Sequence, residues 1–282
     1  MNKIGIWKIG NLIEKKGDTS IYNIVPTKDD SISEENLKDL LDTNWVIKLV
    51  FNYYEEIIRI EQYEIYKQSC SIKMPLEKTY RSGKINDHGW FAMEKYDSNL
   101  YKNFSFGKDK INLLITNIID FIEWLHIEKK IIHGDVKAEN ILINFKNVNR
   151  PFCLIDFESL SKPHNLTCEN HLSTGYYYYA LGCEKDKPYY SYRMDLQAFG
   201  MILWNLTLSV NKFHNFEWQK IANDNYINNN IDNEFIYLES LKSMGNIKNN
   251  LVTKYFEIID KVNWYDTNID PEIYKNLKNI VK

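Results

Sequence analysis

The stretch His133 to Asn140, HGDVKAEN, decides the fold of this chain of 282 residues. It follows a long amphipathic stretch, Lys108 to Glu128, whose apolar spacing predicts a helix. Two short apolar runs come after it, Ile141 to Ile143 and Phe152 to Ile155, and they predict two strands around a loop. The second run belongs to LIDFES, Leu154 to Ser159, which ends the predicted strand with an acidic residue.

Four polar residues in these two segments suit one kind of chemistry, which is phosphoryl transfer. Asp135, Lys137 and Asn140 lie in the loop, and Asp156 ends the second strand. Transfer of a phosphoryl group requires that its charge be neutralised and that the attacking hydroxyl be oriented. Asp and Asn oxygens are suitable ligands for Mg²⁺, and a second Asp can accept the hydroxyl proton.

A buried strand in the first third of the chain carries a further candidate. Trp45 to Phe51, WVIKLVF, is a nearly continuous apolar run with Lys48 inside it. A lysine on a rigid strand can hold the α- and β-phosphates of a nucleotide when a carboxylate orients it. Helical spacing over Tyr53 to Gln68 places Glu61 within an apolar stripe, and Glu64 one turn on is the alternative partner.

The rest of the first third also predicts mainly strands. Ile4 to Ile13 and Ile21 to Val25 flank a polar tip, a pattern typical of a hairpin. Thr27 to Asp42 is polar and acidic and predicts a loop or short helix, and Trp90 to Glu94 predicts another strand.

The remainder of the chain is richer in helix. After Pro188 the pattern is mainly helical, and Asp195 to Leu208 is strongly apolar. Strands followed by helices indicate an α+β protein with two lobes, and we place the boundary near Tyr96 to Asn99.

Taken together, these motifs resemble the eukaryotic protein kinase family, and within it the casein kinase 1 and vaccinia-related group. The resemblance covers about Trp7 to Leu208. The segments that carry it are WKIGNLI (Trp7–Ile13) with Ser20-Ile21-Tyr22, Met93-Glu94, LHIEKKIIHGDVKAENILI (Leu125–Ile143) and SYRMDLQAFGMILW (Ser191–Trp204). It implies a single bilobal protein kinase-like domain over residues 1–282. A small antiparallel sheet with one helix would form the N-lobe, residues 1–96, and a larger, mainly helical C-lobe would span residues 97–282.

The resemblance also implies roles for residues of the catalytic loop. Asp135 would be the catalytic base, and Lys137 would steady the transferring phosphate. Asn140 and Asp156 would bind Mg²⁺, and Asp195 would brace the loop from below. Lys137 favours a protein kinase that phosphorylates Ser and Thr, with ATP as the phosphate donor and proteins as substrates.

Four residues of the first lobe would serve ATP according to the same resemblance. Lys48 would hold the α- and β-phosphates, and Glu61 would pair with Lys48. Met93 and Glu94 resemble the residues called gatekeeper and hinge in this family.

The sequence departs from the family in the loop that covers the phosphates. Glu14, Lys16 and Thr19 stand where the family has glycines, and only Gly17 remains. Glycines let backbone N–H groups approach phosphates closely, so their loss weakens the cradle. This erosion favours an alternative function, a pseudokinase that acts as a binding or scaffold module.

A second departure is Glu158, where the family usually has Gly after Asp-Phe. Asp-Phe-Glu and His-Gly-Asp also occur in small-molecule kinases similar to the aminoglycoside and choline phosphotransferases, which are the other alternative. Against them stand Lys137, the long helix that ends in Leu125-His126, and the helix of Asp195.

A third departure is Gly134, which replaces the Arg that many kinases carry before the catalytic Asp. That Arg normally pairs with a phosphate on the following segment. We therefore predict that four hydroxyl residues of this segment are not obligatory activating phosphosites: Ser161, Thr167, Ser173 and Thr174.

Charge and composition exclude other classes of function. With 35 basic and 38 acidic residues, the net charge is −3, so we expect no direct binding to nucleic acid. The first residues, MNKIGIWKIG, lack the apolar stretch of a signal peptide, and polar residues interrupt Ile111 to Leu125, so we expect no membrane association. Four widely spaced cysteines suggest reduced thiols. We expect an intracellular, cytoplasmic protein from an AT-rich genome, for example in the host cell of a virus; the sequence indicates no oligomeric state.

Overall fold

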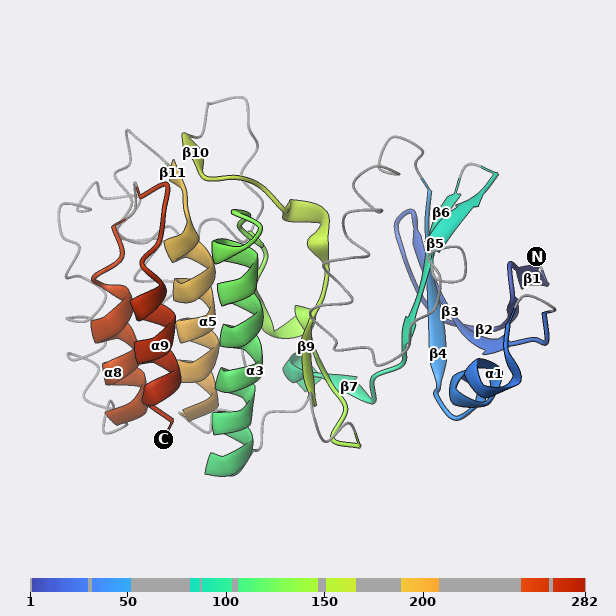
Figure 1. The fold of residues 1–282 in the computed structure, drawn as a ribbon, viewed down its shortest axis with the longest axis horizontal. Helices are drawn as coiled ribbons and strands as arrows, with labels where there is room; N and C mark the ends of the chain where they lie inside the picture. The colour runs from blue at the N-terminus through green and yellow to red at the C-terminus, as the bar shows by residue number, and fades with distance from the viewer. Residues whose placement is uncertain are drawn as a thin grey trace. The chain divides into compact units, whose positions relative to one another are not determined.

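The computed structural model describes residues 2–29, 32–51, 82–86, 88–102, 106–146, 151–165, 189–207, 250–263 and 266–281. The chain divides into two compact units, residues 1–97 and 98–282 (Figure 1). The first consists mainly of strands and the second mainly of helices, so the prediction of an α+β fold is confirmed.

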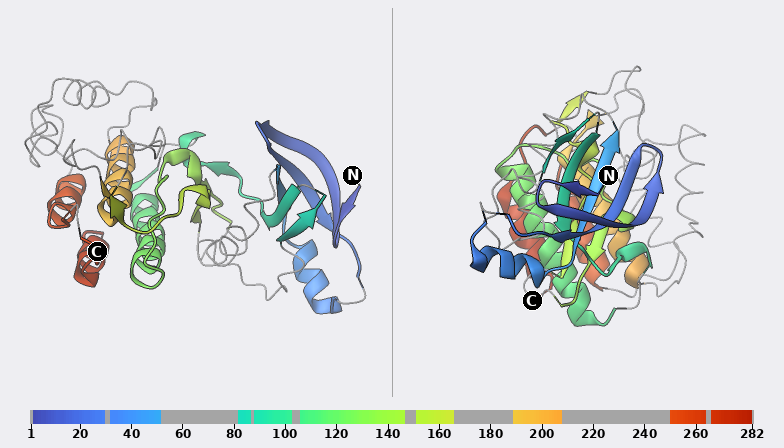
Figure 2. Two further views of the ribbon diagram at one scale, coloured as in Figure 1. Left: turned by 90° about the horizontal axis from the view of Figure 1, so that it is seen from above. Right: turned by 90° about the vertical axis from the view of Figure 1, so that its right-hand side faces the viewer.

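The first unit is built on an antiparallel sheet in the order β1-β2-β3-β4-β6-β5. A short helix, α1, packs beside β3 (Figure 2). The bounds are β1 Lys3–Ile4, β2 Trp7–Lys16, β3 Thr19–Pro26, α1 Glu34–Leu41, β4 Trp45–Phe51, β5 Ser82–Ile85 and β6 His88–Glu94.

Tryptophans form the core on one face of this sheet. The rings of Trp7 and Trp45 lie 5.2 Å apart between centroids, and both side chains are buried together with Ile47 and Trp90. The Nε1 of Trp45 donates a hydrogen bond to the carbonyl of Leu40, which fixes the end of α1 against the sheet. Burial of such large aromatic side chains stabilises the sheet.

The β2–β3 hairpin has longer strands and a shorter turn than the sequence predicted. The strands run to Lys16 and Thr19, which pair with each other, so that only Gly17 and Asp18 form the turn. Gly17 has φ = 55°, and a glycine at the first central position is what a tight hairpin turn of this kind favours. Side chains from Gly10 to Asp18 are mostly exposed, so the apolar alternation that reveals a strand in sequence is lost here.

The second unit packs α3 against α5 and α9, and α8 against α5 and α9. Figure 1 shows these helices side by side. Small strand pairs lie beside them: β7, β8 and β9 form one sheet, and β10 pairs with β11. The helices are α3 Lys108–Ile127, α5 Tyr192–Thr207, α8 Asn250–Ile259 and α9 Pro271–Asn279; the strands are β7 Ser98–Asn99, β8 Ile141–Ile143, β9 Phe152–Leu154, β10 His164–Asn165 and β11 Tyr189–Tyr190.

The cysteine prediction is wrong at one position. Cys153 lies fully buried in β9, and it belongs to a disulfide in the structure.

Within the described part of the chain, no helix is long and apolar enough to cross a membrane. The predicted helix over Tyr53 to Gln68, with Glu61 and Glu64, lies outside the described residues.

Candidate active site

The β8–β9 hairpin brings the two motif segments together. Ile141 pairs with Leu154 in antiparallel register, and the next step of the ladder is a hydrogen bond from the Ile155 N–H to the Asn140 carbonyl, at 2.8 Å. Asn140 therefore enters the hairpin at the point where Asp156 leaves it. The apolar strands are buried, so this register is fixed by the core of the unit.

A compact polar cluster occupies the loop before β8. The Nζ of Lys137 lies 2.6 Å from Oδ2 of Asp135, and Nδ2 of Asn140 donates to the same oxygen at 3.0 Å. The Asn140 Nδ2 also donates to the backbone carbonyl of Asp135, at 2.9 Å. The side chain of Asp135 is 15% exposed and that of Lys137 is 39% exposed, so both can be reached from solvent.

Asp195 on α5 supports this loop from the buried side. Its Oδ2 accepts a hydrogen bond from the His133 backbone N–H at 2.6 Å, and its Oδ1 accepts one from the Gly134 N–H at 2.9 Å. Oδ2 also contacts Nε2 of His126 at 2.8 Å. Burial alone would raise the pKa of Asp195, but the hydrogen bond from His126, the electrostatic interactions with His126 and His133, and the hydrogen bond from the Gly134 N–H hold this pKa below its ordinary value. The predicted bracing role of Asp195 is confirmed by these contacts.

His133 is a buried, structural member of the loop. Burial lowers the pKa of its imidazole below the ordinary value, against the opposing charges of Asp195, Asp135 and Asp156. Its Nδ1 accepts the backbone N–H of Asp135 at 3.2 Å, which requires a ring without a proton on that nitrogen. His133 thereby helps to fix the backbone that presents the Asp135 carboxylate.

Asp156 has a backbone conformation that is uncommon for a residue with a side chain. Its φ of 72° and ψ of 75° lie in the left-handed region, where Asp is tolerated better than most residues. In this segment the positive φ falls on Asp156, whereas Glu158 belongs to the short helical turn Phe157–Ser159. A glycine is therefore not required at position 158 in this conformation. The Phe157 ring packs on His133 and Phe121 and anchors the turn.

The donor set of the second unit fits a magnesium ion. Because the Asn140 amide nitrogen is directed to Asp135, its Oδ1 is the atom left to serve as a ligand. Together with the Asp156 carboxylate, it would offer the hard oxygen donors that Mg²⁺ prefers. The Asn140 side chain is buried and bound at its nitrogen, so its orientation is fixed before any ion arrives.

The first unit places two of the predicted ATP residues on one face of the sheet. Lys48 pairs with Phe91 and Val46 pairs with Met93, so the period of two directs Lys48 and Met93 away from the tryptophan core. Glu94 pairs with Trp45 and belongs to the opposite face. The Nζ of Lys48 lies 5.8 Å from the centroid of the Phe91 ring. Pairing of Lys48 with Glu61 or Glu64 stays a prediction.

Sequence analysis did not predict the buried contacts that lie behind the catalytic loop. His126 ends the buried face of α3, and its Nδ1 contacts the hydroxyl of Tyr274 on α9 at 2.5 Å. Both side chains are fully buried. The Leu125-His126 pair was visible in the sequence only as part of a family resemblance, and Tyr274 carried no signal because its partner lies 148 residues away.

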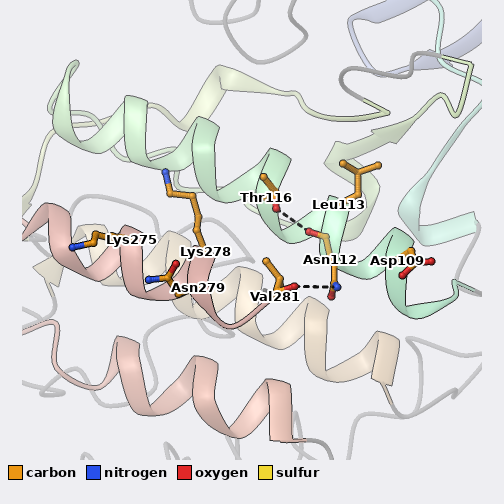
Figure 3. A pocket seen from close by; sticks show the side chains of 8 residues that line it. All are labelled: Asp109, Asn112, Leu113, Thr116, Lys275, Lys278, Asn279 and Val281. Atoms are coloured by element: carbon orange, nitrogen blue, oxygen red, sulfur yellow. Dashed lines mark hydrogen bonds between the residues drawn. The ribbon is translucent and has the colours of Figure 1, made fainter.

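A separate hollow lies between α3 and α9, with a volume of about 660 Å³ (Figure 3). Asn112 and Thr116 line it from α3, and Lys275 and Asn279 line it from α9. It contains none of the residues assigned to phosphoryl transfer.

Comparison with known proteins agrees with this geometry. The model of the protein kinase domain family matches residues 28–267, and the chain belongs to that family. The antiparallel sheet followed by helices is therefore the bilobal protein kinase fold that the motifs predicted.

Two curated relatives are similar over part of their length. The human serine/threonine-protein kinase VRK2 is 27% identical over 158 residues, which are 52% of this chain and 30% of that protein. The serine/threonine-protein kinase KSP1 of Saccharomyces cerevisiae is 27% identical over 168 residues, 57% of this chain and 14% of that protein. The chain thus matches less than a third of the length of either relative. The likeness to VRK2 agrees with the predicted vaccinia-related group.

Proposed function

We propose that this chain is an active kinase that transfers the γ-phosphoryl group of ATP to Ser and Thr hydroxyls of protein substrates. The observation that carries the proposal is the cluster of Asp135, Lys137 and Asn140. Lys137 and Asn140 both lie within hydrogen-bond distance of the Asp135 carboxylate. Asp195 fixes the backbone of this loop from below. Such pre-organised groups are what in-line phosphoryl transfer requires.

Each residue would then act through its own atoms. Asp135 orients the substrate hydroxyl and accepts its proton at a carboxylate oxygen. Lys137, already beside that carboxylate, neutralises charge on the transferring phosphoryl group. Lys48 holds the α- and β-phosphates. Asn140 and Asp156 would hold Mg²⁺, which supplies charge neutralisation on the phosphate oxygens when bound.

The pseudokinase alternative is favoured by one specific observation, the β2–β3 tip. Glu14 and Lys16 lie in strands there, and Gly17 alone has a positive φ. We infer that this change lowers affinity for the nucleotide and the rate of transfer rather than removing them, because the groups that perform the chemistry belong to other segments. Proteins are favoured over small molecules as substrates because Lys137 belongs to the cluster and both similar kinases carry serine/threonine-protein kinase names.

The test is transfer of radiolabelled phosphate from ATP with magnesium to generic protein substrates, to the chain itself and to aminoglycosides and choline. Asp135→Asn should abolish transfer while ATP binding persists. Asp266→Asn, at an exposed aspartate, is the matched control and should keep full activity. Binding of ATP without transfer by the unaltered chain would establish the pseudokinase alternative. Transfer only to the small molecules would establish the third.

We further propose that the chain acts inside cells, on protein partners, without a direct grip on nucleic acid or membrane. Fractionation of expressing cells, followed by detection of the chain in each fraction, tests the location.

A further inference from the structure

A buried chain of hydrogen bonds connects the C-terminal helix of the structure to the catalytic loop. It begins at the Tyr274 hydroxyl on α9, passes through both ring nitrogens of His126 on α3, and reaches Oδ2 of Asp195 on α5. That oxygen also accepts the His133 backbone N–H. All the side chains in this path are at most 1% exposed, so water does not compete for their hydrogen bonds.

The Asp195 carboxylate only accepts, so His126 donates from Nε2. The Tyr274 hydroxyl can both donate and accept, so it pairs with Nδ1 whether the ring is neutral or protonated. Tyr274 thereby fixes the orientation of the His126 ring in either state. A ring without this contact could turn, and Asp195 would lose a fixed partner on the oxygen that holds the loop.

Helix α9 is itself firmly docked. The Asp270 side chain accepts the Glu272 backbone N–H at 2.9 Å and caps its start. Lys278 contacts Asp120 and Glu123 of α3, at 3.0 Å and 2.6 Å. The Nδ2 of Asn112 donates to the Val281 carbonyl beyond the helix (Figure 3). These contacts hold α9 along α3 and leave little freedom for Tyr274.

We propose that Tyr274 is a positioning residue for the catalytic loop, acting through His126 and Asp195 on the backbone of His133 and Gly134. The inference rests on the proposed function for its kinetic consequence, but its structural consequence can be measured in an inactive chain. It extends the active site to a helix whose sequence carries none of the catalytic motifs.

The test compares two tyrosine variants of the full chain. Tyr274→Phe removes only the hydroxyl that contacts His126. Tyr255→Phe is the matched control, because Tyr255 is also fully buried and its hydroxyl also makes one hydrogen bond, to the Leu196 carbonyl of α5 at 2.8 Å. Each loses one buried hydrogen bond, so similar losses of thermal stability are expected. Only Tyr274→Phe should lower kcat, by about three- to tenfold, with little change in KM for ATP.

A second readout does not depend on catalysis. Labelling with ¹⁵N-histidine gives six backbone amide signals, among them that of His133, together with the ring nitrogens of His126. Tyr274→Phe should shift the His133 amide and the His126 Nδ1 signals, and Tyr255→Phe should leave both in place. His126→Asn, which removes the middle of the path, should shift the His133 amide as well.

The two proposals fail in different ways. Shifted signals in a chain that transfers no phosphate would overturn the proposed function and support the positioning role. A His133 amide that stays in place in Tyr274→Phe, or equal kinetic losses in the two tyrosine variants, would overturn the positioning role whatever the activity of the unaltered chain.

Discussion

Asp195 illustrates how much of this site depends on a single residue that does no chemistry. Its two oxygens serve two backbone amides and one imidazole, and the side chain is 1% exposed. Asp195→Asn keeps the volume but places an NH₂ group against an N–H donor. Because a buried donor then has no acceptor, we expect a loss of about 3 kcal/mol in the free energy of unfolding. Urea denaturation measures it.

The control for this substitution is Asp260→Asn. Asp260 also accepts a short hydrogen bond, from Nη2 of Arg193 at 2.7 Å, but its side chain is 26% exposed. Water can replace part of that contact, so a loss of about 1 kcal/mol is expected. Equal losses at the two positions would contradict the role assigned to Asp195.

His133 gives the protein a predictable dependence of stability on pH. Its pKa in the folded chain lies below the ordinary 6.5, because burial disfavours the charged ring. The unfolded chain therefore takes up the proton first as pH falls. The stability from this group is complete above pH 6.5 and is lost as pH falls from 6.5 toward the lower folded pKa, by at most about 1.4 kcal/mol per pH unit.

Urea denaturation between pH 7.5 and 5.5 measures this dependence. In His133→Asn the amide oxygen can still accept the Asp135 N–H, and the other five histidines are unchanged. The variant should lose stability less steeply than the unaltered chain below pH 6.5. The same slope in both proteins would show that His133 titrates alike in the folded and unfolded states.

Single residues differ in how far their place could be predicted from sequence. Asp135, Lys137 and Asn140 lie in one short loop, so local spacing alone brings them together. Met93 and Lys48 share a face because of the register in which β4 and β6 pair, which the apolar runs alone did not predict. The contact of Tyr274 with His126 could not be predicted, because packing between distant helices determines it.

At the level of the element, the close approach of α8 limits the size of the side chain that α5 can carry at position 200. A Cβ at Gly200 would lie 2.8 Å from ring atoms of both Phe256 and Tyr255, which are buried. Gly200→Ala should therefore destabilise the protein by about 1–3 kcal/mol, which exceeds the gain of about 1 kcal/mol from helix propensity. Gly107→Ala, with no atom within 4 Å of the added Cβ, should change the free energy of unfolding by less than about 1 kcal/mol. Thermal unfolding of both variants measures the difference, and a stabilising Gly200→Ala would refute the packing argument.

The segment after Asp156 is a second element whose local structure leads to a prediction. Two backbone hydrogen bonds with Ile132, at 2.7 Å and 3.1 Å, hold Ser161 against the loop. Gly134 has φ = 77°, so an Arg in its place would be strained, and the usual partner for a phosphate is missing. We expect that replacing the four predicted non-obligatory phosphosites with alanine leaves more than about half of the phosphate-transfer activity. These are Ser161, Thr167, Ser173 and Thr174. Loss of activity in this variant, restored by the single residue responsible, would identify an activating phosphosite.

At the scale of the whole molecule, sequence predicted the strand and helix segments well where one face is buried. The bounds of β4 and β8 agree with the apolar runs, and α3 ends within one residue of its predicted end. The chain divides into its two compact units after Asp97. The lengths of the exposed hairpin strands were underestimated, because their side chains meet water on both faces and show no apolar periodicity.

The proposed function assigns Lys48 to the α- and β-phosphates of ATP. ATP with magnesium at about 100 times its dissociation constant should then stabilise the chain by about 2.7 kcal/mol and raise Tm by about 5–10 °C. Lys48→Met should lose most of this shift, since it removes the proposed phosphate contact without touching the core. Lys84→Met, an exposed lysine on β5 of the same sheet, should keep the shift, and so should Asp135→Asn. A full shift in Lys48→Met would show that Lys48 does not contribute to nucleotide binding. No shift in the unaltered chain would mean that the loss of glycines from the β2–β3 tip has abolished nucleotide binding.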